Sequence, residues 1–234
     1  MRGIATHLVK SGFDRLGLEF QRSTTLRRFL ATHPIDLVVD AGANLGQFAG
    51  LVRSKGYKGR IWSFEPVGHV FDAVAARAKS DPSWQVSKLA LGDKPGEAEI
   101  NVSNNHTLSS FLPASSMLAS YDAADGTVRE TVRVETLDCV LKDDPARSIF
   151  LKLDVQGFEK PVLEGAKGTL ERVHALYVEL PVEHLYEGEW TFAEAIAYLD
   201  ALGFTPAQFR TVNSLPNDRA SAVEFDCLFR RKTA

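Results

Sequence analysis

The fold is indicated most clearly by residues 37–48, which read Leu37-Val38-Val39-Asp40-Ala41-Gly42-Ala43-Asn44-Leu45-Gly46-Gln47-Phe48. A short β-branched apolar run ends at an acid, passes through glycines and continues as a helical pattern, which is typical of the first strand, loop and helix of an α/β sheet. Gly42 and Gly46 allow a tight turn and a close ligand approach, because glycine has no Cβ. The glycines are spaced by four, so the dinucleotide fingerprint G-x-G-x-x-G is absent. The loop therefore favours a ligand with an amino-acid end and no pyrophosphate, such as S-adenosylmethionine.

Composition places the chain among ordinary globular proteins. Its 234 residues are 44% hydrophobic and 24% charged, enough for one sizeable α/β domain. A net charge of −3 gives no broad electrostatic reason to expect a nucleic-acid partner. No apolar run approaches the ~20 residues of a membrane span, and the first residues lack a signal-peptide core. We expect a cytoplasmic protein in which Cys139 and Cys227 are buried apolar residues.

The order of predicted elements indicates a doubly wound, mostly parallel sheet that ends in an antiparallel C-terminal edge. Residues 1–34 predict an N-terminal helical cap, which could mediate a homodimer or contact a lipid-linked acceptor, and residues 35–234 predict one α/β domain. Predicted strands are 35–40, 60–65, 84–90, 96–103, 131–134, 148–154, 175–180, 205–211 and 222–230. Predicted helices are 45–55, 68–80, 137–141, 159–172 and 192–202, the last with a capping box at Thr191 and Glu194. The polar segment 104–129 is typical of a lid or binding loop.

Acidic residues recur where predicted strands end, which is the rim where open α/β sheets bind ligands. The five acids are Asp40, Glu65, Asp93, Asp154 and Glu179. Any one of them could instead cap a helix N-terminus. Because buried carboxylates are costly without partners, five at one rim favour a ligand site.

The first three acids fit an adenosine ligand. Glu65 can accept both ribose hydroxyls, a geometry shared by NAD and S-adenosylmethionine proteins. Asp93, in Ala90-Leu91-Gly92-Asp93, can reach the adenine amino group while Leu91 packs on the ring. The alternative is that Gly92 and Asp93 only form a tight turn.

The second block is Leu151-Lys152-Leu153-Asp154-Val155-Gln156-Gly157-Phe158-Glu159. Asp154 is the candidate general base, or the ligand of a divalent cation such as Mg²⁺ that activates an acceptor hydroxyl, and Glu179 could share that work. Lys152 is expected to extend to water.

The predicted lid adds three candidates. His106 suits proton transfer near neutral pH, although a loop histidine can equally be a solvated surface group. The hydroxyls of Ser109 and Ser110 could close over the cofactor.

Together these blocks resemble the FkbM-type methyltransferases, which use S-adenosylmethionine and have a Rossmann-like class I methyltransferase fold. The matching segments are Val38–Gly46, Ser63–Pro66, Ala90–Asp93, Leu151–Glu159, Val162–Gly165 and Val178–Leu180. The resemblance implies that Asp40, Gly42, Ala43, Asn44 and Gly46 hold the methionine part, Glu65 with Pro66 the ribose, and Asp93 the adenine. It places Asp154 at the methyl-transfer centre. Gln156 stands where the family usually has glutamate, which leaves metal dependence open.

The expected function is O-methylation of a hydroxyl on a sugar, glycolipid or glycosylated secondary metabolite. One alternative is a nicotinamide-dependent oxidoreductase or epimerase, which would need a pyrophosphate-binding glycine pattern and a proton relay that the sequence lacks. The other is a non-catalytic adenosine-binding protein, for which Gln156 is the hint.

Overall fold

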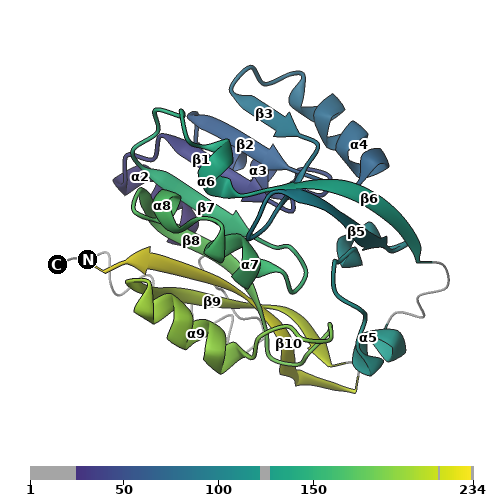
Figure 1. Ribbon diagram of the computed structural model, residues 1–234. Helices are drawn as coiled ribbons and strands as arrows, with labels where there is room; N and C mark the ends of the chain where they lie inside the picture. Colours follow the sequence, from purple (N-terminus) through teal and green to yellow (C-terminus); the bar gives the residue numbers. More distant parts are fainter. Residues whose placement is uncertain (1–24, 122–126, 216, 233–234) are drawn as a thin grey trace, which may run out of the picture.

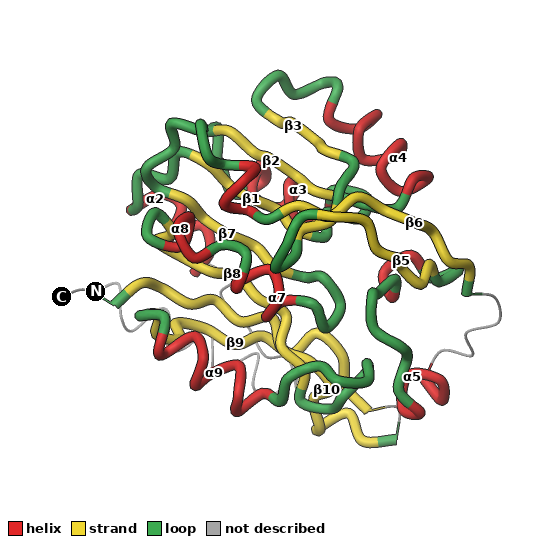
Figure 2. The backbone as a smooth tube through the Cα atoms, in the orientation of Figure 1, coloured by secondary structure: helices red, strands yellow, loops and turns green. Residues whose placement is uncertain are grey.

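The computed structural model describes residues 25–121, 127–215 and 217–232. Most of the predicted N-terminal cap lies outside these residues, and its described part is the helix α2 (Thr25–Thr32). Strands and helices alternate along the described chain, as Figures 1 and 2 show. None of the described helices is long and apolar enough to span a membrane.

The described residues form a main sheet of seven strands in the order β3-β2-β1-β7-β8-β10-β9. The strands are β1 (Leu37–Ala41), β2 (Arg60–Phe64), β3 (Trp84–Ser87), β7 (Ile149–Leu153), β8 (Val173–Pro181), β9 (Phe204–Leu215) and β10 (Asp218–Arg231). The first five in the sheet order are parallel, whereas β10 is antiparallel to both β8 and β9. The predicted parallel sheet with an antiparallel C-terminal edge is therefore confirmed.

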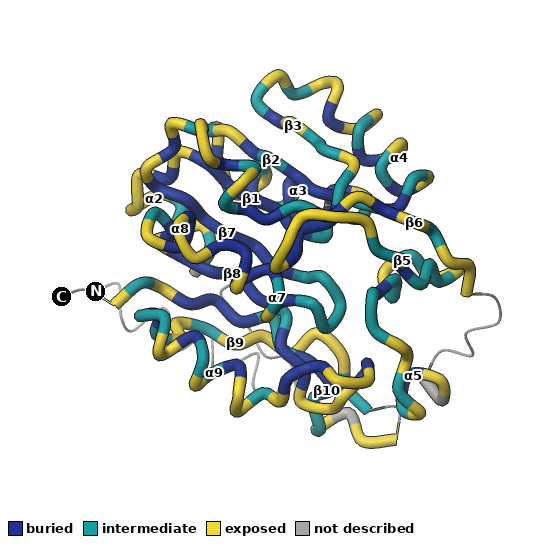
Figure 3. Tube along the Cα trace, in the orientation of Figure 1, coloured by how far each residue is buried: buried dark blue, intermediate teal, exposed yellow. Residues whose placement is uncertain are grey.

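Helices cover both faces of the main sheet, because alternate strand residues point to opposite sides. Val39 and Leu151 pack with the helices α6 to α9, while Val38 and Phe150 pack with α2 to α4. The helix bounds are α3 (Gln47–Ser54), α4 (Gly68–Ala78), α6 (Leu137–Val140), α7 (Glu159–Glu164), α8 (Lys167–Leu170) and α9 (Phe192–Ala201). β1 and β7 are buried at every position (Figure 3), which explains why they are apolar apart from Asp40 and Lys152. The predicted capping box at Thr191 and Glu194 is present at the start of α9.

A smaller sheet has the order β4-β6-β5 and carries the remaining strands. These are β4 (Ala90–Leu91), β5 (Gly96–Val102) and β6 (Val128–Glu135). The predicted single strand 84–90 is wrong, because β3 ends at Ser87 and β4 pairs with β6 instead. The polar segment that follows β5 contains the 3-10 turn η1 (His106–Leu108) and α5 (Ser116–Tyr121).

Two further sequence predictions are corrected. The predicted helix 159–172 is two helices, α7 and α8, separated at Gly165, where a Cβ atom would lie 2.0 Å from the Gly92 carbonyl oxygen. The backbones pack too closely there for a side chain. Cys139 is exposed rather than buried, because α6 is a single surface turn, whereas Cys227 is buried as expected.

The sheet order places a ligand crevice between β1 and β7. The chain runs outward from β1 through β2 to β3 and then returns to the other side of β1 as β7. The carboxyl ends of β1 and β7 therefore flank the switch in strand order, where open α/β sheets bind ligands. The loop after β1 and the loop after β7 touch at Gly42. A Cβ atom at this position would lie only 1.8 Å from the Asp154 carbonyl oxygen, and the φ of Gly42 is 72°, so the contact requires glycine.

Candidate active site

A cavity of about 460 Å³ opens at this switch point. Its wall comes from the loop after β1, from α3, from the ends of β2, β7 and β8, and from β4 with parts of β5, β9 and β10. The segment of residues 106–111, which includes η1 and is called the η1 segment below, completes it. This volume lies in the range of small-molecule binding sites. One continuous cavity thus reaches from the predicted adenosine residues to the predicted catalytic acids.

The adenosine side contains half of the residues predicted to bind the cofactor. Those that line the cavity are Gly42, Ala43, Asn44, Glu65, Pro66 and Leu91. Leu91 is buried and presents an apolar surface beside Ala90 and Leu89, which suits a planar ring. The remaining predicted cofactor residues occupy other positions, described below.

Glu65 is a buried carboxylate held by backbone donors. Its Oε2 accepts a hydrogen bond from the Asn44 amide at 2.8 Å, and its Oε1 accepts one from the Val67 amide at 3.0 Å. Burial raises the pKa of Glu65 to about 7, although these two hydrogen bonds act in the opposite direction. A carboxylate has about four acceptor sites, so each oxygen keeps one for a ligand hydroxyl.

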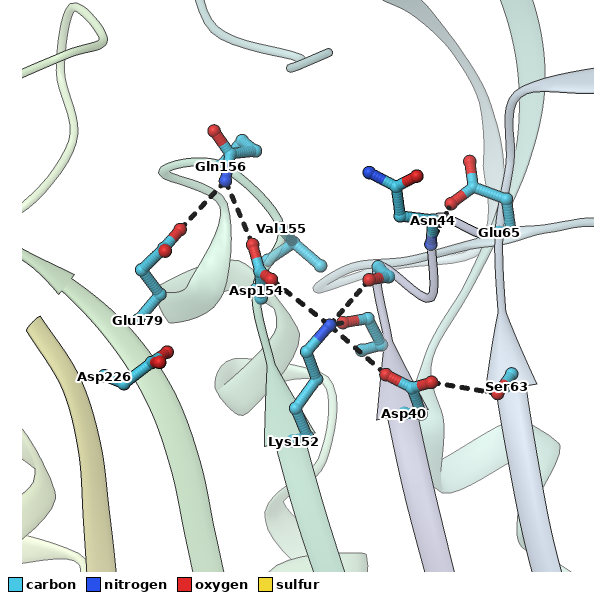
Figure 4. A network of polar contacts seen from close by, with 12 residues as sticks. Asp40, Asn44, Ser63, Glu65, Lys152, Asp154, Val155, Gln156, Glu179 and Asp226 are labelled. Atoms are coloured by element: carbon cyan, nitrogen blue, oxygen red, sulfur yellow. Dashed lines mark hydrogen bonds and ion pairs between the residues drawn. The ribbon is translucent and has the colours of Figure 1, made fainter. Parts of the chain in front are cut away.

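Asp40 lies beneath the cavity and does not line it. Its Oδ2 accepts a hydrogen bond from Ser63 at 3.0 Å, and the Ser63 hydroxyl in turn accepts one from Trp84. Its Oδ1 lies 3.2 Å from the Lys152 ammonium (Figure 4). Asp40 therefore supports the glycine loop from below.

The expectation that Lys152 extends to water is wrong. The side chain is buried, and its Nζ donates to the carbonyl oxygens of Ala41 at 3.2 Å and Gly42 at 2.6 Å. It also lies 3.4 Å from Asp154 Oδ2 (Figure 4). Burial lowers the pKa of this ammonium, but the charges of Asp154 and Asp40 outweigh burial and hold the pKa above its ordinary value. Lys152 joins the loop after β1 to the acid at the end of β7.

Besides Asp40, four predicted cofactor residues lie outside the cavity wall, namely Gly46, Gly92, Asp93 and Ser110. Gly46 packs against Trp84, where a Cβ atom would lie 2.6 Å from the indole ring. Gly92 and Asp93 follow Leu91 but turn away, and Asp93 is exposed. Ser110 is buried and donates a hydrogen bond to the Gln156 carbonyl oxygen at 2.6 Å.

The predicted catalytic acids meet on the opposite side of the cavity. Asp154 and Glu179 both line the wall, and the Gln156 amide nitrogen lies 2.9 Å from an oxygen of each (Figure 4). Burial and the neighbouring Asp154 charge raise the pKa of Glu179 well above its ordinary value.

The η1 segment carries two more predicted residues of the cavity wall, His106 and Ser109. The Ser109 hydroxyl accepts a hydrogen bond from the Ser103 amide. His106 Nδ1 is buried and has no hydrogen-bond partner among the described residues. The role of His106 in proton transfer stays a prediction.

Several wall residues were not recognised in the sequence. They come from the C-terminal strands β8, β9 and β10 and are Tyr177, Arg210, Val212, Asn213, Glu224 and Asp226. Arg210 pairs with Asp226 across the strands, and Asn213 donates to Glu224 at 2.8 Å. Burial raises the pKa of Glu224 to about 7. The charged residues within the two predicted C-terminal strands were the sequence signal that could have indicated these wall residues.

The described residues contain no group of three or more histidine, cysteine or acidic side chains arranged to hold a metal ion. The suggested role of Asp154 as a metal ligand therefore has no support from the site geometry. Its carboxylate is instead bonded by Gln156 and paired with Lys152.

Comparisons with known proteins agree with this fold. The chain is 27% identical over 213 residues to the 2-O-methyltransferase NoeI of Sinorhizobium fredii (strain NBRC 101917 / NGR234), an alignment that covers 86% of this chain and 82% of NoeI. The crystal structure of TehB from Haemophilus influenzae superposes with a TM-score of 0.50 at 8% identity, covering 94% of this chain and 65% of TehB, which is a likeness of fold. A family model described as the methyltransferase FkbM domain matches residues 40–206. The chain belongs to the FkbM methyltransferase family.

Proposed function

We propose that this protein is an S-adenosylmethionine-dependent O-methyltransferase that acts on a hydroxyl of a sugar, glycolipid or glycosylated metabolite. The observation that carries the proposal is one cavity whose two sides suit two ligands. Glu65 and Leu91 stand on one side, and Asp154 and Glu179 on the other. Residues 35–234 form the catalytic domain in this proposal.

The adenosine side fits the cofactor. Glu65 keeps two acceptor sites for the two ribose hydroxyls, because Asn44 and Val67 occupy only one site on each oxygen. When bound, S-adenosylmethionine supplies an electrophilic methyl group on a sulfonium sulfur.

On the acceptor side, Asp154 is the proposed general base. Its carboxylate accepts the hydroxyl proton as the acceptor oxygen forms its bond to the methyl carbon, while the electrons of the broken carbon–sulfur bond stay on sulfur. Lys152 and Gln156 hold the two Asp154 oxygens, so the base is oriented before the acceptor binds. Positioning of this kind supplies much of the rate in a one-step displacement.

The acceptor class is supported by two observations. The NoeI relative is named a 2-O-methyltransferase, which favours oxygen as the methylated atom. The acceptor wall includes the carboxyl groups of Glu179 and Glu224, which suit a ligand rich in hydroxyl groups.

The test is transfer of a labelled methyl group from S-adenosylmethionine to a panel of neutral saccharides and glycosides. The expected product carries the label as a methyl ether on one hydroxyl. Label that appears on nitrogen or carbon would refute O-methylation. Tight binding of S-adenosylhomocysteine without transfer to any acceptor would favour the non-catalytic alternative.

A further inference from the structure

Gln156 occupies an unusual position between the two acids. Its φ is 54°, in the left-handed region that residues with side chains rarely adopt, and such conformations persist where the surroundings hold them. The turn aims the side chain back across the ends of β7 and β8. Its Nε2 donates to Asp154 Oδ1 and to Glu179 Oε2, each at 2.9 Å (Figure 4).

The orientation of the amide is fixed by a third residue. Tyr186 is a buried residue, 2% exposed, and its hydroxyl donates to Gln156 Oε1 at 2.7 Å. With the amide oxygen facing this hydroxyl, both hydrogens of the amide nitrogen are directed at the carboxylates. Tyr186 therefore determines that Gln156 acts as a double donor.

The same junction contacts the η1 segment. Ser110 donates to the Gln156 carbonyl oxygen at 2.6 Å, and the Tyr186 hydroxyl lies 3.2 Å from the Leu108 carbonyl oxygen. Gln156 is thus bonded to the segment that carries His106 over the cavity.

Two adjacent carboxylates repel each other, and a bridging group must offset this repulsion. A neutral amide gives each acid one hydrogen bond and adds no negative charge. A glutamate of the same shape would place a third acid between them and remove both donors. The identity of residue 156 therefore decides whether the pair is joined by hydrogen bonds or needs an added cation.

We propose that Gln156 is the positioning residue of the acceptor side, an inference that rests on the methyl-transfer function proposed above. Its amide joins Asp154 and Glu179 into one unit around the acceptor hydroxyl, and its contacts with Tyr186 and Ser110 link that unit to the η1 segment. The cofactor contacts of Glu65 do not depend on it.

Gln156→Glu tests this role, because it keeps the side-chain shape. We expect kcat for methyl transfer to fall roughly 10- to 100-fold, because the acid that receives the proton is displaced. The affinity for S-adenosylhomocysteine, measured by calorimetry, is expected to stay within about threefold, well under the 1.4 kcal/mol that a tenfold change represents. Gln85→Glu, on the exposed side of β3, is the matched control and is expected to change neither quantity.

A second measurement requires no turnover. Three converging carboxylates form a hard-cation site, so millimolar MnCl₂ is expected to raise the melting temperature of Gln156→Glu by roughly 2–4 °C. The same salt is expected to leave the wild-type and Gln85→Glu proteins unchanged. Tyr186→Phe, which removes only the anchoring hydroxyl, is expected to lower kcat in the same direction by a smaller factor.

The inference is overturned if Gln156→Glu keeps wild-type kcat, if its loss appears mainly as weaker S-adenosylhomocysteine binding, or if Mn²⁺ produces no thermal shift in that variant. Failure of the proposed function is recognised separately. In that case the wild-type protein binds no S-adenosylhomocysteine or methylates no hydroxyl, while the Mn²⁺ measurement still reports whether residue 156 lies between the two acids.

Discussion

Replacing Lys152 with methionine is expected to destabilise the fold severely. The ammonium has four partners, namely the carboxylates of Asp40 and Asp154 and the carbonyl oxygens of Ala41 and Gly42. Asp40 is fully buried, and its Oδ1 has no hydrogen-bond partner among the described residues besides this ion pair. Removing one member of a buried ion pair costs about 3–5 kcal/mol, because the other charge stays buried without compensation. That cost is a large fraction of the roughly 5–15 kcal/mol that stabilises a typical protein.

Urea unfolding of the wild type, Lys152→Met, Asp40→Asn and the double variant measures this effect. The double variant is expected to be more stable than the sum of the single losses predicts, by about 0.5–3 kcal/mol, because it no longer leaves the fully buried Asp40 carboxylate without a cation, while the partly exposed Asp154 can be solvated. Lys142→Met, at an exposed turn, is the control and is expected to stay within about 0.5 kcal/mol of the wild type. A loss below about 1 kcal/mol for Lys152→Met, or strict additivity in the double variant, would refute the reasoning.

Three further predictions concern the cavity. Asp154→Asn is expected to lower kcat by roughly 10²–10⁴-fold with little change in S-adenosylhomocysteine affinity, and wild-type turnover would remove Asp154 from the mechanism. Because burial raises the pKa of Glu65 to about 7 and only its ionised form accepts two hydroxyl hydrogen bonds, cofactor affinity is expected to weaken as the pH falls below about 7. Below pH 7 the dissociation constant is expected to rise by up to roughly tenfold per pH unit, and this pH dependence is expected to disappear in Glu65→Gln. Calorimetry across pH 5 to 8 checks both expectations. Gly42→Ala is expected to lose more stability in urea unfolding than Gly56→Ala, because both glycines have positive φ but only Gly42 has the Asp154 carbonyl oxygen within 4 Å; equal losses would exclude a steric cause.

The fold was largely predictable from local patterns. Short apolar segments such as the one around Val38 and Val39 alternate along the chain with segments that have helical periodicity. This order alone predicts a parallel sheet with helices on both faces. The same rule explains why Asp154 and Glu179 could be placed together, since the carboxyl ends of neighbouring parallel strands meet at one rim. The strand predicted at 84–90 failed because β3 ends at Ser87 and Ala90 pairs with β6, which is distant in sequence.

The polar contacts of the site were much less predictable. Lys152 lies in a strand between two apolar residues, a pattern that also suits a side chain reaching water, and its partners Asp40 and Ala41 lie more than a hundred positions earlier in the chain. The bridging role of Gln156 depends on Tyr186, which follows the next strand. Asp93 has a plausible motif, but the turn after Leu91 directs it to solvent. Such outcomes depend on the three-dimensional packing of distant segments.

The β9–β10 hairpin has an evolutionary consequence. It supplies Arg210, Asn213, Glu224 and Asp226 to the cavity from the sheet margin, whereas the glycine loop and Glu65 belong to the central strands. β9 is largely exposed, so replacements on it disturb little packing. Under the proposed function, related chains can therefore change the acceptor they take by substitutions along this hairpin, because other strands build the cofactor side.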